Sequence, residues 1–479
     1  MDQTQNLAIW NPGMKPRLQP ESSQRQLFQA HFDQVLDFRH PLVLLADKID
    51  WNRFQLALAD CYSPDLGAPA LAVRLMVGLL YLKHAFDLSD ESLLERWVEN
   101  PYWQYFCGFQ TMQHVVPIHS TSLTKWRQRV GAERLPLLLK ETIDLAVREK
   151  QIKPQELAHV TVDTTVQEKN ITYPTDSKLY LRAIHQLVRA AKLHGIKLRQ
   201  TYVRVAQRAA IMVGRYAHAK QFKRMRKTLR QMRTWLGRVL RDIRRKMPTP
   251  DAKWTRLLEL CERLHKQQPT DKKKLYSLHE TEVQCISKGK ARQRYEFGQK
   301  VTIATSNRGN WIVGAELCPG NPFDGHTLAS AIANIEKLTS VPVTAAYVDK
   351  GYRGHNYQGA ATIHIAGSSN RGLSATIKRR RRRRSAVEPK IGHLKSENRL
   401  GRCYLKGLAG DHINVLLAAA GSNLLKLLRA LAPALKNWLV YWLGPLFLLN
   451  KTAIRSRPAY QNQQPGQCHA APPEPFYSI

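Results

Sequence analysis

A long basic block in the middle of the chain limits its possible folds more than any other feature. Within 182–246 Lys and Arg recur throughout, and Asp242 is the only acidic residue. Leu, Ile, Val and Met recur there at helical spacing, which predicts long amphipathic basic helices. Pro248 and Pro250 end these helices, because proline cannot continue one, and 252–267 predicts one further helix. Any sheet must therefore be built from segments on both sides of a helical insertion.

Strand patterns lie on both sides of the block. HVTVDTT, which begins at His159, alternates apolar and polar residues, with Val160 and Val162 on one face. After the block, YEFGQKVTIATS and WIVGAELCPG flank the turn sequence NRGN at 307–310, which predicts a hairpin. HTLASAIANIEKL predicts a helix, VPVTAAYVD a buried strand, and ATIHIAG a short strand. INVLLAAAGSNLLKLLRAL predicts a helix that covers the sheet.

The resulting order is strand, helical insertion, hairpin, helix, strand, strand, helix. With the insertion set aside, this is the order of an RNase H-like domain, whose mixed sheet carries acidic residues on its first strand, after its fourth strand and on a late helix. The predicted fold class is therefore α/β. It comprises an RNase H-like catalytic core with a mixed central sheet, a long basic helical insertion after the first strand, and an all-α N-terminal domain.

The periodicity also divides the chain into segments. We expect an irregular N-terminus over 1–25, and a helical DNA-binding or dimerisation domain over 26–150, either with helix-turn-helix character or as a plain bundle. The catalytic domain is expected to combine 155–180 with 275–430, and the basic insertion is 181–274. A C-terminal helix and a disordered tail are expected over 431–479.

The charge indicates the kind of partner. Lys and Arg number 74 against 37 Asp and Glu, a net charge of +37 with a pI near 10.2. Such an excess points to a polyanion, most simply nucleic acid; a ribosome-associated or merely highly charged protein is the alternative. The 7 Cys form no CxxC pair, which fits a reducing cytoplasm. The apolar run Trp438–Leu449 is too short to span a bilayer, so no membrane partner is expected.

Three acidic residues stand out against this charge. Asp163 lies in HVTVDTTVQEKN, Asp349 in TAAYVDKGYRG and Glu388 in RRSAVEPKIGHLK. Carboxylates repel phosphate, so carboxylates near DNA indicate a divalent cation between the two. Mg²⁺ is bound by a few carboxylates plus substrate phosphates, and two such ions can flank a scissile phosphate. We expect Asp163 to bridge both ions, and Asp349 and Glu388 to hold one each.

Two other aspartates compete for the same role. Asp324 precedes a predicted helix that starts near His326, and it is expected to cap that helix. Asp176 lies in YPTDSK and is expected to be a turn residue. Glu168 and Lys169 are expected either to support the ligands or to be exposed charges. The aromatic rings of Trp235 and Trp254 are expected to pack within the insertion rather than to stack on a flipped base.

Basic residues near Glu388 and Asp349 are candidates for phosphate contacts. Arg384 and Lys395 would share the face of Glu388 on a continuous helix, although Pro389 indicates that the helix begins near Glu388. KRRRRRR at 378–384 is expected to be a phosphate-binding strip that forms a disordered loop without DNA. Lys350 and Arg353 flank a glycine turn and are expected to bind the DNA backbone.

Several blocks resemble the DDE transposases of bacterial insertion sequences, of the insertion-sequence-five type. They are VDTTVQEKNITYPTDSKL, KLYSLHETEVQCISKGK, YEFGQKV, NPFDGHTL, VDKGYRG and VEPKIGHLKSENRLGR, with WNRFQLALADCY and DLSDESLLERWVENPYWQYF in the N-terminal part. The resemblance covers most of the chain. It implies an RNase H-like core that depends on Mg²⁺ (or Mn²⁺) and acts on the terminal inverted repeats of the element.

The resemblance also assigns roles to single residues. The two aspartates and the glutamate of the family match Asp163, Asp349 and Glu388. The Tyr-Arg-Glu-Lys signature of the family matches Arg384, Glu388 and Lys395, whereas its Tyr position falls at Arg381. The chain departs from the family there, which leaves open the DNA-end contact made from that position.

The predicted function is therefore a DNA transposase that cleaves inverted-repeat ends and joins the 3′-hydroxyl to target DNA. At least two protomers are expected because two ends are cut, so a homodimer or higher oligomer should act in the bacterial cytoplasm, associated with the nucleoid. Two alternatives stay open. They are a non-catalytic or repurposed DNA-binding protein, and an RNase H-like nuclease without strand transfer.

Overall fold

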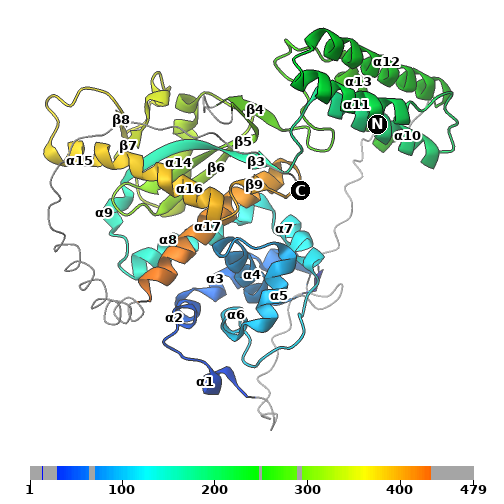
Figure 1. Ribbon diagram of the computed structural model, residues 1–479. Helices are drawn as coiled ribbons and strands as arrows, with labels where there is room; N and C mark the ends of the chain where they lie inside the picture. Colours follow the sequence, from blue (N-terminus) through cyan, green and yellow to red (C-terminus); the bar gives the residue numbers. More distant parts are fainter. Residues whose placement is uncertain (1–12, 15–29, 64–70, 248–250, 288–293, 433–479) are drawn as a thin grey trace, which may run out of the picture. The chain divides into compact units, whose positions relative to one another are not determined.

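A mixed sheet surrounded by helices forms the centre of the protein. The computed structural model describes residues 13–14, 30–63, 71–247, 251–287 and 294–432 (Figure 1). The predicted C-terminal helix, the disordered tail and most of the predicted irregular N-terminus lie outside these ranges. Within them the chain is α/β, as the sequence predicts.

The central strand of the sheet is β3 (His159–Lys169). It pairs antiparallel with β5 (Tyr295–Ser306) and parallel with β7 (Ala345–Val348). β5 continues antiparallel to β6 (Ile312–Cys318), and β7 continues parallel to β8 (Thr362–Ile365). The strands therefore lie in the order β6, β5, β3, β7, β8, which places β3 between the hairpin and the parallel pair.

Two short strands extend this sheet. β4 (Gln284–Ser287) pairs with the first part of β5, and β9 (Arg402–Cys403) pairs in parallel with the end of β3. β1 (Gly13–Met14) and β2 (Tyr62–Ser63) form a separate two-stranded pair. The hairpin predicted around 307–310 is confirmed as β5 and β6, whose turn contains Asn310 at positive φ (56°). Asn tolerates this backbone conformation better than most residues do.

Helices cover the sheet. α14 (Leu328–Thr339) packs on β6, α16 (Val387–Glu397) packs on β3, and α17 (Gly407–Ala430) packs on β6. α17 also contacts the N-terminal helices α4 (Val73–Ala85) and α8 (Pro136–Arg148). By length and composition α17 could cross a membrane, but 78% of its apolar window is buried inside the protein. We therefore interpret α17 as a core helix.

The N-terminal helices share one hydrophobic core with the sheet. This core extends from Leu42 in α2 to Leu427 in α17 and includes Val160 and Val162 of β3. Ser89 accepts a hydrogen bond from the N–H of Ser92 and so caps α5, as expected for an N-cap serine. The remaining helices of this part are α1 (Phe32–Val35), α2 (Pro41–Lys48), α3 (Trp51–Ala57), α5 (Asp90–Glu99), α6 (Pro101–Phe106), α7 (Ser120–Arg134) and α9 (Pro154–Leu157).

The basic block forms a helical insertion with its own core. Its helices are α10 (Asp176–Leu193), α11 (Val203–His218), α12 (Phe222–Lys246) and α13 (Ala252–Lys266), drawn in green in Figure 1. Leu187, Leu236 and Leu258 are buried among them. Trp254 is buried in this core, and the ring of Trp235 stacks on that of Tyr202 at 5.9 Å. Both tryptophans therefore pack within the insertion, as predicted.

Lys169, at the end of β3, lies in a buried ion-pair network. Its Nζ is 2.8 Å from Asp411 of α17 and 3.2 Å from Glu280, which lies between α13 and β4. Gln167 donates a hydrogen bond to the Asp411 carbonyl. Lys169 is therefore a structural residue that ties the end of β3 to α17 and to the segment returning from the insertion, and it is not an exposed charge.

The KRRRRRR segment differs from its prediction. Instead of a disordered loop it forms most of α15 (Ala375–Arg383), which η4 (Arg384–Ala386) connects to α16. Ser374 caps α15 by accepting from the N–H of Ile377. The guanidinium of Arg383 donates to the backbone carbonyls of Asn307 and Arg308 in the β5–β6 turn. These contacts tie the end of α15 to the β5–β6 turn, and the local sequence does not reveal them.

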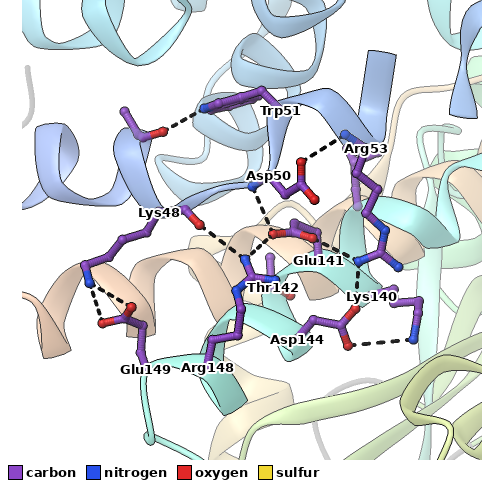
Figure 2. A network of polar contacts seen from close by, with 12 residues as sticks. Lys48, Asp50, Trp51, Arg53, Lys140, Glu141, Thr142, Asp144, Arg148 and Glu149 are labelled. Atoms are coloured by element: carbon purple, nitrogen blue, oxygen red, sulfur yellow. Dashed lines mark hydrogen bonds and ion pairs between the residues drawn. The ribbon is translucent and has the colours of Figure 1, made fainter. Parts of the chain in front are cut away.

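A buried carboxylate joins the segment between α2 and α3 to α8 (Figure 2). Glu141 has a side chain that is 1% exposed. Its Oε1 accepts from Arg148 (2.7 Å) and from the N–H of Asp50 (3.2 Å), and its Oε2 accepts from Arg53 (3.0 Å). Three donors thus converge on one desolvated acid, which makes it a structural residue rather than a catalytic candidate.

Replacing Glu141 tests this assignment. Glu141→Ala is expected to lower the free energy of unfolding by about 1–3 kcal/mol, because it removes the buried acceptor that Arg53, Arg148 and the N–H of Asp50 share. Glu149→Gln is the matched control: its Lys48 partner is 35% exposed, so the loss should be at most about 1 kcal/mol. Denaturant unfolding of both variants measures the difference, and equal stabilities would contradict a structural role for Glu141.

Candidate active site

Asp163 lies on β3, and Asp349 directly follows the neighbouring parallel strand β7. Thr161 of β3 pairs with Tyr347 of β7, and each aspartate follows two residues further along its own strand. Asp349 comes directly after β7 and keeps an extended backbone. Adjacent strands are about 4.8 Å apart, and residues at matching positions face the same side of the sheet. The fold therefore brings these two predicted residues together.

Each aspartate is oriented by a backbone donor. The Oδ1 of Asp163 accepts from the N–H of Thr164 at 2.8 Å. The Oδ1 of Asp349 accepts from the N–H of Gly351 at 2.8 Å, so that Asp349 caps the short helix η3 (Lys350–Tyr352). Both residues are partly exposed, so a ligand can approach their carboxylates from solvent.

The buried side chain of Tyr352 is surrounded by negative charge near Asp163 and Asp349. Tyr352 is 0% exposed. Burial raises the pKa of its hydroxyl, and the negative charges of Asp163, Asp324 and Asp349 raise that pKa further. A phenol influenced by all three carboxylates places them around one region at the end of β7. Such a concentration of negative charge favours a cation.

Glu388 approaches from a different element. It is the second residue of α16, which packs on β3. Asn310 donates to the carbonyl of Ala386 just before α16, and Lys395 near its end lies 4.0 Å from Glu296 of β5. α16 therefore extends over the sheet between these two anchors. Pro389 falls in its first turn, as predicted, where the missing N–H costs no hydrogen bond.

The side chain of Glu388 is 61% exposed and pairs with Arg384 at 2.9 Å. Within the described ranges, no group of three or more His, Cys, Asp or Glu side chains has an arrangement that could hold a metal ion. Mg²⁺ needs no such cage, because it is commonly held by one or two carboxylates, waters and substrate phosphates. The hard oxygen donors of Asp163 and Asp349 fit that requirement. The complete triad stays a prediction.

The predicted phosphate contacts have different surroundings. Lys350 and Arg353 are exposed on and after η3. Arg384 is held by Glu388. Lys395 lines a cavity of about 510 Å³ beside α16, together with Asp87, Glu168, Glu296, Arg399, Gly401, Arg402 and Tyr404. The DNA contacts of these residues stay predictions.

Arg381, at the position where the family has Tyr, is held by a loop. Its guanidinium donates to the carbonyls of Ile365 (2.6 Å) and Ser369 (2.9 Å) and to the Oδ1 of Asn370 (2.8 Å). It thus ties α15 to the segment that follows β8. The departure from the family introduces a side chain with a structural role, and a DNA contact from Arg381 stays a prediction.

The prediction that Asp324 caps the helix starting near His326 is wrong. Asp324 does not cap the following helix, because the N-cap of η2 (Asp324–Thr327) is Phe323 and the N-cap of α14 is Thr327. Instead, its Oδ1 accepts from the Oγ1 of Thr164 and from the Nζ of Lys300, both at 2.9 Å. Sequence reasoning missed this role, since the partners come from two strands that are distant in sequence and carry no recognisable motif.

Asp176 also differs from its prediction as a turn residue. It is the first residue of α10, after Thr175, whose Oγ1 accepts from the N–H of Lys178. Its side chain is exposed. Acidic residues are favourable in the first turn of a helix because of the helix dipole, so Asp176 has a local structural explanation.

The insertion presents a strongly basic surface along α12. One cavity of about 750 Å³ has no acidic lining residue; it is lined by Lys223, Arg226, Lys227, Arg230, Gln231, Thr234, Trp235 and Arg238. A second cavity of about 690 Å³ shares Arg238 and adds Arg199, Arg241, Arg244 and Arg245, but it is also lined by the acidic residues Asp242 and Glu262. Phosphate groups are the natural partners of such a surface.

Comparisons with known proteins agree with this arrangement. The family described as Transposase domain (DUF772) matches residues 30–129, and the family described as Transposase DDE domain matches residues 346–428. The second match includes both Asp349 and Glu388.

A relative from Rhizobium meliloti, "Uncharacterized protein ORF8 in nfe locus", is 52% identical over 209 residues, which are 44% of this chain and 100% of that protein. No solved structure matches. On the two transposase family matches and this relative, the chain belongs to the DDE transposases of the insertion-sequence type.

Proposed function

We propose that the protein cleaves the inverted-repeat ends of a mobile element and joins the freed 3′-hydroxyl to target DNA, using an RNase H-like core. The observation that carries the proposal is that Asp163 on β3 and Asp349 directly after β7 each lie two residues beyond the paired Thr161 and Tyr347, with Glu388 on a helix packed against β3. The strand order β6, β5, β3, β7, β8, antiparallel on one side of β3 and parallel on the other, supports the RNase H-like assignment.

Asp163, Asp349 and Glu388 are the proposed ligands of divalent cations, Mg²⁺ or Mn²⁺. When bound, such ions lower the pKa of the attacking hydroxyl and stabilise the leaving oxygen. The two aspartates present hard oxygen donors on one side of the sheet. Glu388 would supply the third carboxylate after exchanging its contact with Arg384, which frees that guanidinium for a phosphate.

Two displacements at phosphorus complete the proposed reaction. A water oxygen attacks the phosphodiester at the element end, and the 3′-oxygen leaves and takes up a proton. That 3′-hydroxyl then attacks a target phosphodiester and displaces its 3′-oxygen. Each step exchanges one P–O bond for another, so neither needs an external energy source. Positioning and electrostatic stabilisation carry the catalysis.

The other parts of the chain are proposed to hold DNA. Residues 26–150 would serve DNA binding or dimerisation, and 181–274 would hold DNA through the basic surface of α12. The catalytic domain would be formed by 155–180 and 275–430. The proposed contacts near the scissile phosphate are Arg384, Lys395, Lys350, Arg353 and Arg381. Two or more protomers would act together on two ends in the bacterial cytoplasm, at the nucleoid.

The test uses the DNA that flanks the coding region. Purified full-length protein is expected to cleave oligonucleotides from those flanks at their inverted repeats in Mg²⁺, and to join the cleaved strand to a plasmid. Removing divalent ions with a chelator is expected to abolish both products, and Mg²⁺ to restore them. Cleavage without joined product would favour the nuclease. Binding without cleavage, or cleavage that persists without metal, would contradict the proposal.

A further inference from the structure

Asp324 occupies a position that links three parts of the proposed site. Its Oδ1 receives the hydroxyl of Thr164, the residue after Asp163, and the ammonium of Lys300 on β5. Lys300 is 10% exposed and Asp324 is 29% exposed, so this ion pair is shielded from solvent. Lys300 also donates to the carbonyl of Pro322 at 2.6 Å, which holds the segment that carries Asp324.

The second oxygen of Asp324 faces Asp349. A Cβ placed on Gly351 would lie 3.3 Å from the Oδ2 of Asp324 and 3.1 Å from the Oδ1 of Asp349. Both carboxylates therefore approach the same small space above Gly351. The 3-10 turns η2 and η3, which carry the two groups, pack against each other.

We propose that Asp324 is a positioning residue of the active site. It would hold the side chain of Thr164 and thereby fix the Thr164 backbone, whose N–H donates to the Oδ1 of Asp163. Together with Lys300, it would also define the location of the η2 turn beside Asp349. This inference rests on the proposed function, because it assumes that Asp163 and Asp349 are metal ligands. Groups that orient metal ligands typically change metal affinity by about 10–100-fold when they are removed.

Four variants distinguish a positioning role of Asp324 from an effect of its charge alone. Asp324→Asn removes one negative charge and weakens both hydrogen bonds. Lys300→Met removes a positive charge, so an electrostatic effect alone would strengthen cation binding, whereas loss of the anchor of Asp324 would weaken it. Thr164→Val removes a hydrogen bond without a change in charge, and Thr164→Ser restores the hydroxyl.

The measurement is Mn²⁺ binding to the full-length protein by titration calorimetry, together with the Mg²⁺ concentration needed for half-maximal DNA cleavage. Asp324→Asn, Lys300→Met and Thr164→Val are each expected to weaken Mn²⁺ binding by about 10–100-fold and to raise the Mg²⁺ requirement in parallel. Thr164→Ser is expected to bind Mn²⁺ as the wild type does. Thermal melts identify any variant that fails to fold, and the Thr164 pair keeps the test valid if Asp324→Asn unfolds.

Asp163→Asn is the reference variant, because it distinguishes failure of the proposed function from failure of the inference about Asp324. If Asp163→Asn leaves Mn²⁺ binding and cleavage unchanged, the proposed function fails. If Asp163→Asn abolishes both while Asp324→Asn behaves like the wild type, only the inference about Asp324 fails. Unchanged binding in Thr164→Val together with tighter binding in Lys300→Met would show that Asp324 acts by charge alone, and would overturn a positioning role.

Discussion

Replacing Asp163 with Asn is expected to lower the rate of DNA-end cleavage by about 10³-fold or more, as losses of central electrostatic groups do. Asp163 lies on the central strand of the sheet, two residues beyond the Thr161–Tyr347 pair, and Asp349 directly follows β7 at the same distance from that pair. An amide has nearly the same shape as the carboxylate but no charge, so the fold should survive while the affinity for a divalent cation falls.

The measurement is single-turnover cleavage of an end oligonucleotide in Mg²⁺, alongside DNA binding by the same protein. Asp176→Asn is the matched control, since that exposed aspartate begins α10 outside the proposed site. Binding should be retained in both variants, with cleavage lost only in Asp163→Asn. Equal cleavage by Asp163→Asn and the wild type would remove the enzymatic proposal and favour a DNA-binding protein.

DNA binding is expected to weaken by roughly 10³-fold or more between about 50 and 200 mM salt, because a surface that neutralises many phosphates displaces condensed counterions on binding. The cavity along α12 contains five Lys and Arg side chains and no acid. Changing Lys223, Arg226, Lys227 and Arg230 to Gln should reduce the steepness of the salt dependence by about 0.9 for each phosphate that the protein no longer neutralises.

A control variant with the same loss of charge distinguishes direct DNA contact by the α12 surface from a general effect of net charge. It replaces four cations of the insertion that do not line this cavity, namely Lys253, Arg256, Lys272 and Lys273. Their replacement by Gln should leave the salt slope close to that of the wild type. Fluorescence anisotropy at several salt concentrations measures both sets. Equal slopes for the two sets would mean that α12 is not a specific DNA surface.

The predictions that succeeded depend on local patterns. Alternating residues from His159 predicted β3, the NRGN turn predicted the β5–β6 hairpin, and apolar residues at helical spacing predicted α12 and α17. The strand and helix signals reflect repeats of two and 3.6 residues that come from burying one face of an element, and the turn signal reflects residue types that suit a tight turn. The charge of the basic block likewise follows from composition alone and needs no tertiary structure.

Apart from Asp176, whose position in the first turn of α10 is a local feature, the predictions that failed concern residues whose partners are distant in sequence. Asp324 looked like a helix cap because it precedes a helix, yet Lys300 and Thr164 bind its side chain. The arginines of α15 looked like a disordered strip, yet Arg381 and Arg383 bind carbonyls of two separate loops. Such contacts depend on which strands lie side by side.

By itself, the sequence determined most of the strands and helices, the separation of a basic helical insertion from a sheet-forming chain, and the choice of acidic residues worth testing. Only the tertiary structure decided that β3 lies beside β7, that Asp324 binds Thr164 and Lys300, and that Glu388 lies on a helix packed against β3. The physical reason is that periodicity and charge act over neighbouring residues, whereas the pairing of strands depends on the packing of one hydrophobic core that extends from Leu42 to Leu427.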